Sequence, residues 1–377
     1  MTTTPFDSYR PPEKKKRRRS GVRGAVTGAT RDLAKGGSRG WLTREGGGQR
    51  EAPAVPDAEF SSYYGQSIVK PVPWDHKISA YLFVGGIAGA SGIMQAGAAA
   101  TGNEILRRNT RLTAMVTVGL SGAALVADLG RPERFLNMLR TVKLTSPMSV
   151  GTWILSGYSA FSGVTTASEV LGMMPTRGPL RLLSGVVAPL TAPAAAGQAL
   201  LGAPLAAYTS VLLSDTAHPV WHESRRQLPF VFVGSAALAS GGVQMILSPL
   251  AAAGPARRLA LLGVGTELVA MHQLEEHLAD LRIEEPIVSG QGARKLRLAK
   301  VLTIAGGVGT LLSGRSRLVA LASGAALATA SALTRMGVVE AGIESAKDPK
   351  YTVRVQKDRL EARRSTGVVD DSIITVR

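Results

Sequence analysis

The chain alternates between long apolar runs and short polar connections. Each run is about 20 residues long, enough for an α-helix to cross a hydrocarbon core of about 30 Å. Backbone amides in lipid must be hydrogen-bonded within the helix, so the pattern predicts an all-α bundle of eight membrane-spanning helices. The runs occupy residues 78–101, 111–128, 149–171, 191–213, 228–248, 257–277, 297–313 and 317–337.

Prolines interrupt the region around the fourth run, at Pro189, Pro193 and Pro204. Proline removes a backbone donor and clashes with the preceding turn of a helix. We therefore expect a short interfacial piece to precede the fourth span.

The two ends of the chain are polar. Residues 1–70 are rich in Gly, Pro and Arg and lack apolar periodicity, which predicts a basic, largely disordered tail. The run Lys14–Arg19 has no apolar segment behind it, so it indicates a lipid-facing basic patch rather than a signal peptide. Residues 341–377 predict a second polar tail, which leaves residues 71–340 as the membrane domain.

The composition of the chain limits the classes of molecule that we expect it to bind. The chain is 45% hydrophobic, and its 43 glycines favour close packing of helices in lipid. A net charge of +17 would suggest nucleic acid for a soluble protein, but in a membrane protein basic residues report topology and attraction to anionic lipid. We therefore expect a lipid bilayer and no nucleic acid as partner. Without cysteine, the chain cannot itself hold an iron–sulfur cluster by thiolates.

The distribution of lysine and arginine predicts the orientation of the chain in the membrane. The short connections on the two faces carry nearly equal numbers of them, whereas both tails are strongly basic. The positive-inside rule then predicts that both ends of the chain lie in the cytoplasm.

With this topology, reactive side chains gather on one face. That face receives Trp74–Lys77, the connection 128–151, residues 208–222 and residues 272–277. Interfacial anchoring would explain the Trp and Tyr residues but not the clustered Asp, His and Arg. The connection that begins at Asp128 is too elaborate for a plain turn, and we expect it to form the mouth of a site.

Four segments on this face, in order, resemble the NrfD/polysulfide-reductase membrane subunits, and the resemblance covers about residues 70–340. They are Trp74–Gly89, Asp128–Pro132, Ser146–Trp153 and Tyr208–Ser214.

The resemblance implies a quinone-reactive membrane anchor. Such subunits bind a ferredoxin-like 4Fe-4S subunit linked to a molybdopterin oxidoreductase subunit, and the expected quinone is menaquinone. The chain itself would hold no haem or iron–sulfur cluster. In the family the quinone pocket is lined from the start of the first helix and the end of the fourth, which maps onto His76 and Tyr208; Trp74, Asp75 and Arg131 complete the candidate site.

The chemistry of these residues suits quinone reduction, which takes up two electrons and two protons. His76 can donate to one carbonyl oxygen and be reprotonated from water. Tyr208 is a neutral donor for a carbonyl. Asp128 beside Arg131 either relays protons or braces the loop.

Glu267 lies in the middle of the sixth run. A charge at membrane depth costs roughly 2.5–3.5 kcal/mol on insertion scales, so this side chain should face the bundle interior. It is either a catalytic proton carrier or a protonated acid hydrogen-bonded to a neighbouring helix.

A proton-coupled membrane transporter is the alternative from another class, because an intramembrane acid and broken helices also suit a transport pathway. The sequence shows no convincing internal two-fold similarity, which such a transporter would be expected to have. A haem anchor would need paired histidines within facing helices, whereas the histidines here lie at a helix end or in a connection.

Overall fold

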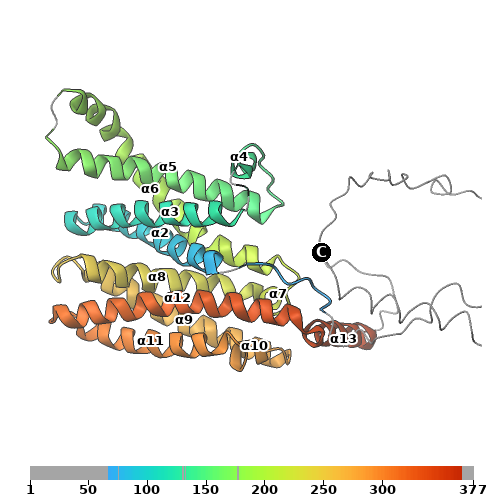
Figure 1. The fold of residues 1–377 in the computed structure, drawn as a ribbon. Coiled ribbons are helices and arrows are strands. Elements are labelled where there is room, and N and C mark those ends of the chain that lie inside the picture. Colours follow the sequence, from blue (N-terminus) through green and yellow to red (C-terminus); the bar gives the residue numbers. More distant parts are fainter. Residues whose placement is uncertain (1–66, 75, 130, 132, 176–177, 367–377) are drawn as a thin grey trace, which may run out of the picture. The chain divides into compact units, whose positions relative to one another are not determined.

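The computed structural model describes residues 67–366, apart from 75, 130, 132 and 176–177, and within these residues it contains helices and no strand (Figure 1). Asp75, most of the predicted N-terminal tail with Lys14–Arg19, and residues 367–377 lie outside the described residues.

Eight long helices coincide in order with the eight predicted apolar runs. They are α2 (His76–Ala100), α3 (Glu104–Asp128), α5 (Pro147–Met173), α6 (Pro179–Ser214), α8 (Leu228–Leu247), α9 (Gly254–Asp280), α11 (Ala293–Leu312) and α12 (Arg317–Lys347). The shorter elements between and after them are α4 (Arg134–Met138), α7 (Pro219–Glu223), the 3₁₀ turn Ser224–Arg226, α10 (Glu285–Val288) and α13 (Pro349–Ser365).

Five of the long helices are long and apolar enough to cross a membrane: α2, α3, α6, α8 and α12. The other three do not meet these conditions of length and apolar composition; α11, for example, carries Arg294, Lys295, Arg297 and Lys300 in its first half. The all-helical membrane fold is therefore confirmed, and the count of eight crossings stays a prediction.

The predicted break before the fourth span is wrong. Helix α6 runs without interruption from Pro179 to Ser214, with all three prolines inside it. Each proline removes only one N–H, and a long helix in a membrane bundle tolerates that loss. The rings of Pro189, Pro193 and Pro204 are exposed on the outside of the bundle, so they leave its packing intact.

Glycine pairs bring the long helices close together. An added Cβ at Gly89 of α2 would lie 2.5 Å from the carbonyl oxygen of Gly202 in α6, and one at Gly242 of α8 would lie 2.7 Å from that of Gly324 in α12. Such close approach of small residues is typical of helix packing in lipid. Helices α2, α3, α5 and α6 pack together, and α8, α9, α11 and α12 form a second group that α8 joins to α2 and α6 (Figure 1).

Candidate functional site

A small, mostly apolar cavity lies where α2 and α5 begin and where α3 and α6 end. Its volume is about 70 Å³. Leucine, isoleucine and methionine side chains supply most of its wall, and the residues with polar groups are Trp74, Tyr81, Asp128, Thr152 and Tyr208. Four segments that are far apart in the sequence thus meet at one end of the bundle.

The ring of Tyr208 is held by a glycine on the neighbouring helix. Gly151, in the first turns of α5, lies directly against the ring, and any Cβ at this position would overlap it. The tyrosine is only half-buried, so its hydroxyl can meet a ligand in the cavity.

Asp128 is the last residue of α3 and brings a carboxylate to the cavity wall. Thr152 contributes less chemistry, because its hydroxyl already donates a 2.8 Å hydrogen bond to the carbonyl oxygen of Met148. Besides Asp128, the hydroxyl-bearing rings of Tyr81 and Tyr208 give the wall groups that can exchange protons or hydrogen bonds with a ligand.

Trp74 belongs to an aromatic stack that continues away from the cavity. Its ring centroid lies 5.6 Å from that of Trp221, which lies 4.6 Å from that of His218. Trp221 is fully buried and donates a 2.8 Å hydrogen bond to the carbonyl oxygen of Val338. The backbone N–H of Val72 donates to Nε2 of His218 at 3.4 Å. Burial lowers the pKa of His218, which favours the neutral ring that this bond requires.

The other predicted site residues do not line this cavity. His76 is the first residue of α2 and is exposed, and Arg131 is exposed in the connection after α3. Asp75 lies outside the described residues. The structure thus brings Trp74, Asp128 and Tyr208 together and leaves His76 and Arg131 at the surface.

Glu267 lies elsewhere, buried inside the bundle as the cost of a carboxylate in lipid requires. Its Oε1 accepts a 2.7 Å hydrogen bond from the hydroxyl of Thr334 on α12. The next residue, Arg335, is also fully buried; it donates a 2.6 Å hydrogen bond to the carbonyl oxygen of Phe232 and lies 3.8 Å above the phenyl ring. Glu267 Oε2 and two guanidinium nitrogens of Arg335 have no hydrogen-bond partner within the described part of the chain.

The model of the family described as polysulphide reductase, NrfD, matches residues 67–281, more than half of the chain. The chain belongs to the NrfD family. NrfD proteins are membrane-integral subunits of quinone-interacting oxidoreductases and typically associate with iron–sulfur and molybdopterin subunits. The NrfD match contains every residue of the cavity wall as well as Glu267, and it ends before α11. A comparison of the sequence with curated proteins finds no match.

Two features near the cavity were not predicted from the sequence. Trp221 was one of the residues on the predicted face, but its stacking between Trp74 and His218 depends on how α7 folds back. The second feature is α13, which holds the α6–α7 region through Arg359, whose Nη2 lies 2.7 and 2.9 Å from the two carboxylate oxygens of Glu223. An acid and an arginine separated by more than a hundred residues give no local signal.

Proposed function

We propose that this chain is a quinone-reactive membrane anchor and that its cavity binds the quinone head group. Electrons would pass between a ferredoxin-like 4Fe-4S subunit, itself linked to a molybdopterin-type catalytic subunit, and membrane quinone, with menaquinone as the expected form. The observation that carries the proposal is the convergence of Trp74, Asp128 and Tyr208 in an apolar cavity inside the NrfD-matched region.

The residues present suit a quinone in chemistry, and the cavity has to widen at least about twofold to hold the ring. Apolar side chains cover most of the wall, which fits a hydrophobic ring, and Tyr208 and Asp128 add the polar groups. The cavity of about 70 Å³ is smaller than the roughly 150 Å³ that holds benzene in an engineered protein cavity. Met138 and Met148 line the wall, and unbranched methionine side chains can move to admit a ring.

The proposed roles follow from the positions of the side chains. Tyr208 donates a hydrogen bond to a carbonyl oxygen, and Asp128 supplies or accepts a proton at the wall. Reduction adds two electrons and two protons, so the protons have to reach the cavity from water. His76 and Arg131, exposed beside the segments that form the wall, are placed to exchange and guide them.

Removing the Tyr208 hydroxyl tests the cavity directly. In the complex with its enzyme partners, Tyr208→Phe should lower quinone-linked turnover about tenfold, because one hydrogen bond to the reacting group is lost. Dye-linked activity, which bypasses this subunit, should remain. Tyr351→Phe is the matched control, since it removes a hydroxyl from α13, outside the cavity. Equal quinone-linked turnover in the Tyr208 variant and the wild type would remove Tyr208 from the site.

Purification in mild detergent tests the partners. We expect an iron–sulfur protein and a molybdopterin enzyme to co-purify with the chain. A chain that purifies alone, and that moves a solute with protons across vesicle membranes, would favour the transporter alternative instead.

A further inference from the structure

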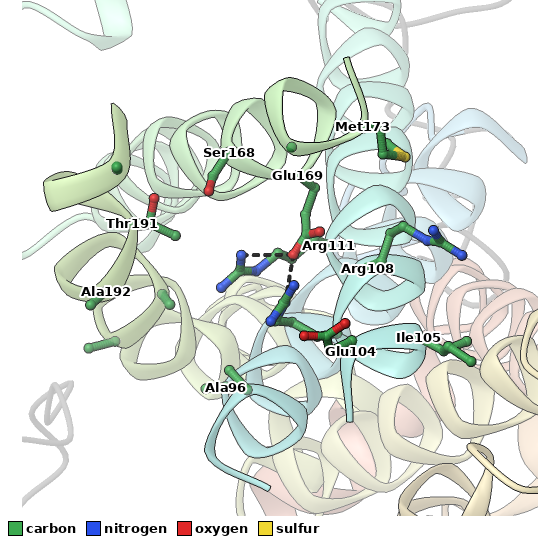
Figure 2. A pocket seen from close by; sticks show the side chains of 16 residues that line it. Ala96, Glu104, Ile105, Arg108, Arg111, Ser168, Glu169, Met173, Thr191 and Ala192 are labelled. Carbon is green, nitrogen blue, oxygen red and sulfur yellow. Dashed lines mark hydrogen bonds and ion pairs between the residues drawn. The ribbon is translucent and has the colours of Figure 1, made fainter. Parts of the chain in front are cut away.

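A second and larger pocket lies at the other end of the same four helices. It is bounded by the end of α2, the start of α3, the end of α5 and residues 188–196 of α6, and its volume is about 770 Å³ (Figure 2). Tyr208 and Asp128 lie at the opposite ends of their helices, so the proposed quinone chemistry does not use this pocket.

A buried ion-pair network fixes one side of the pocket. Glu169 of α5 accepts hydrogen bonds from Nε of Arg107 at 2.7 Å and from Nη1 of Arg111 at 2.9 Å, and Figure 2 shows both contacts at the carboxylate. Nε of Arg111 also donates to the side-chain oxygen of Gln95 on α2 at 3.0 Å. Arg111 and Glu169 are almost fully buried, so this wall is held rigidly in place.

The pocket keeps an excess of positive charge. Its wall contains Arg107, Arg108 and Arg111 against Glu104 and Glu169, three positive groups and two negative ones, which leaves a formal charge of +1. Arg108 lies exposed at the rim, with its guanidinium turned outward from Glu169 in Figure 2. No ion pair joins it to a described residue. A guanidinium group binds phosphate oxygens in pairs, and a phosphodiester carries the single negative charge that would balance this wall.

Mostly small side chains line the rest of the wall, among them Ala99 of α2 and Ala192 of α6, together with the hydroxyls of Ser168 and Thr191. Leu182 and Leu190 of α6 are exposed on the outer surface of the same region. Helices α2 and α3 are each long and apolar enough to cross a membrane, so a pocket at the end of α2 and the start of α3 lies at the depth of lipid headgroups. Basic pockets between helices at this depth are suited to anionic headgroups.

We propose that the pocket between α2, α3, α5 and α6 binds the phosphate of an anionic phospholipid, with Arg108 as the guanidinium that meets it and the alanine-lined wall holding the acyl chain. This site is independent of the quinone cavity, and the two proposals can fail separately.

Native mass spectrometry of the purified full chain tests the site with two added lipids, phosphatidylglycerol and phosphatidylcholine. The wild type should retain phosphatidylglycerol in preference to phosphatidylcholine. Arg108→Gln should weaken phosphatidylglycerol retention about tenfold, the effect of one lost charged hydrogen bond. Arg258→Gln is the matched control, because Arg258 is exposed near the start of α9, at the same end of the bundle but outside the pocket; its lipid retention should equal that of the wild type.

A second variant tests the apolar wall without changing any charge. Ala192→Trp should fill the pocket from α6 and reduce lipid retention as strongly as Arg108→Gln does. Equal retention of the two lipids, or an equal loss in the Arg108 and Arg258 variants, would overturn the proposal, because either result means only general surface attraction. Displacement of the lipid by millimolar inorganic phosphate would also overturn it in favour of a soluble anion.

Discussion

At the scale of single residues, one glycine determines where the Tyr208 ring can lie. The ring rests on the backbone of α5 at Gly151, in space that a methyl group would fill. We expect Gly151→Ala to displace the ring and lower quinone-linked turnover about tenfold, while the protein still inserts and assembles. Gly163 on the same helix has no atom near its missing Cβ. Gly163→Ala should therefore behave as the wild type, and an equal loss in both variants would indicate a helix defect instead.

The buried ring of His218 predicts a pH effect of known sign. Because burial lowers its pKa in the folded protein, the unfolded chain takes up the proton more readily, and stability falls as the pH drops below about 6.5. The midpoint of thermal unfolding, followed by tryptophan fluorescence, should decrease between about pH 7.5 and about pH 5.5. His218→Gln should lose part of that decrease. His272→Gln, at an exposed position on α9, should retain it; identical pH profiles for the two variants would contradict the prediction.

The residue scale also shows where sequence reasoning stops. Topology put the start of the first helix and the end of the fourth on one face, and the family resemblance paired them in one pocket. Trp74 and Tyr208 do line one cavity. The direction of a side chain at a helix start depends on the rotation of that helix about its axis, which packing against its neighbours determines. His76 is therefore exposed at the start of α2 although Ile78, two residues later, lines the wall.

At the scale of elements, apolar runs predict helix positions well because lipid requires them to be apolar. Helix ends follow less closely. Helix α3 begins at Glu104, well before its apolar run, with the side chain of Asn103 accepting a 3.1 Å hydrogen bond from the N–H of Leu106. Polar residues at a membrane surface can stay helical, so hydropathy does not mark those ends. The prediction of a break in α6 was wrong because the cost of proline known from soluble helices is larger than its cost in a membrane bundle.

The contact between α9 and α12 carries the prediction for Glu267. Glu267→Gln keeps the oxygen that accepts from Thr334, so we expect normal assembly. The second carboxylate oxygen has no hydrogen-bond partner among the described residues, and two guanidinium nitrogens of Arg335, the residue after Thr334, have none either. A purely structural hydrogen bond does not need such unpaired buried groups. We therefore expect quinone-linked turnover to fall about tenfold.

Glu340→Gln is the control for this variant, because Glu340 lies on the same α12 helix and forms an ion pair with Lys295 at a half-exposed position. Unchanged turnover in the Glu267 variant would mean that Glu267 has only a structural role, as a protonated acid that joins two helices.

At the scale of the whole molecule, the orientation can be tested because the chain has no cysteine of its own. Single cysteines at Ala217 and Thr101 occupy exposed positions at opposite ends of the first four long helices. If both chain ends are cytoplasmic, a membrane-impermeant maleimide should label Thr101→Cys from outside intact cells and Ala217→Cys only in inverted vesicles. Labelling of both from one side would contradict the eight-span topology, and a reversed pattern would place the quinone cavity at the outer surface.

Helix α6 is too long for the layer that it has to cross. Its 36 residues extend over roughly 54 Å, against a hydrocarbon thickness of about 30 Å. The helix can accommodate the excess length by tilting, by extending some of its turns into the headgroup region, or by both. Because Tyr208 lies near the far end of this helix, membranes of different thickness would set its ring at different depths, so the acyl composition of the host bilayer becomes a variable of the proposed quinone chemistry.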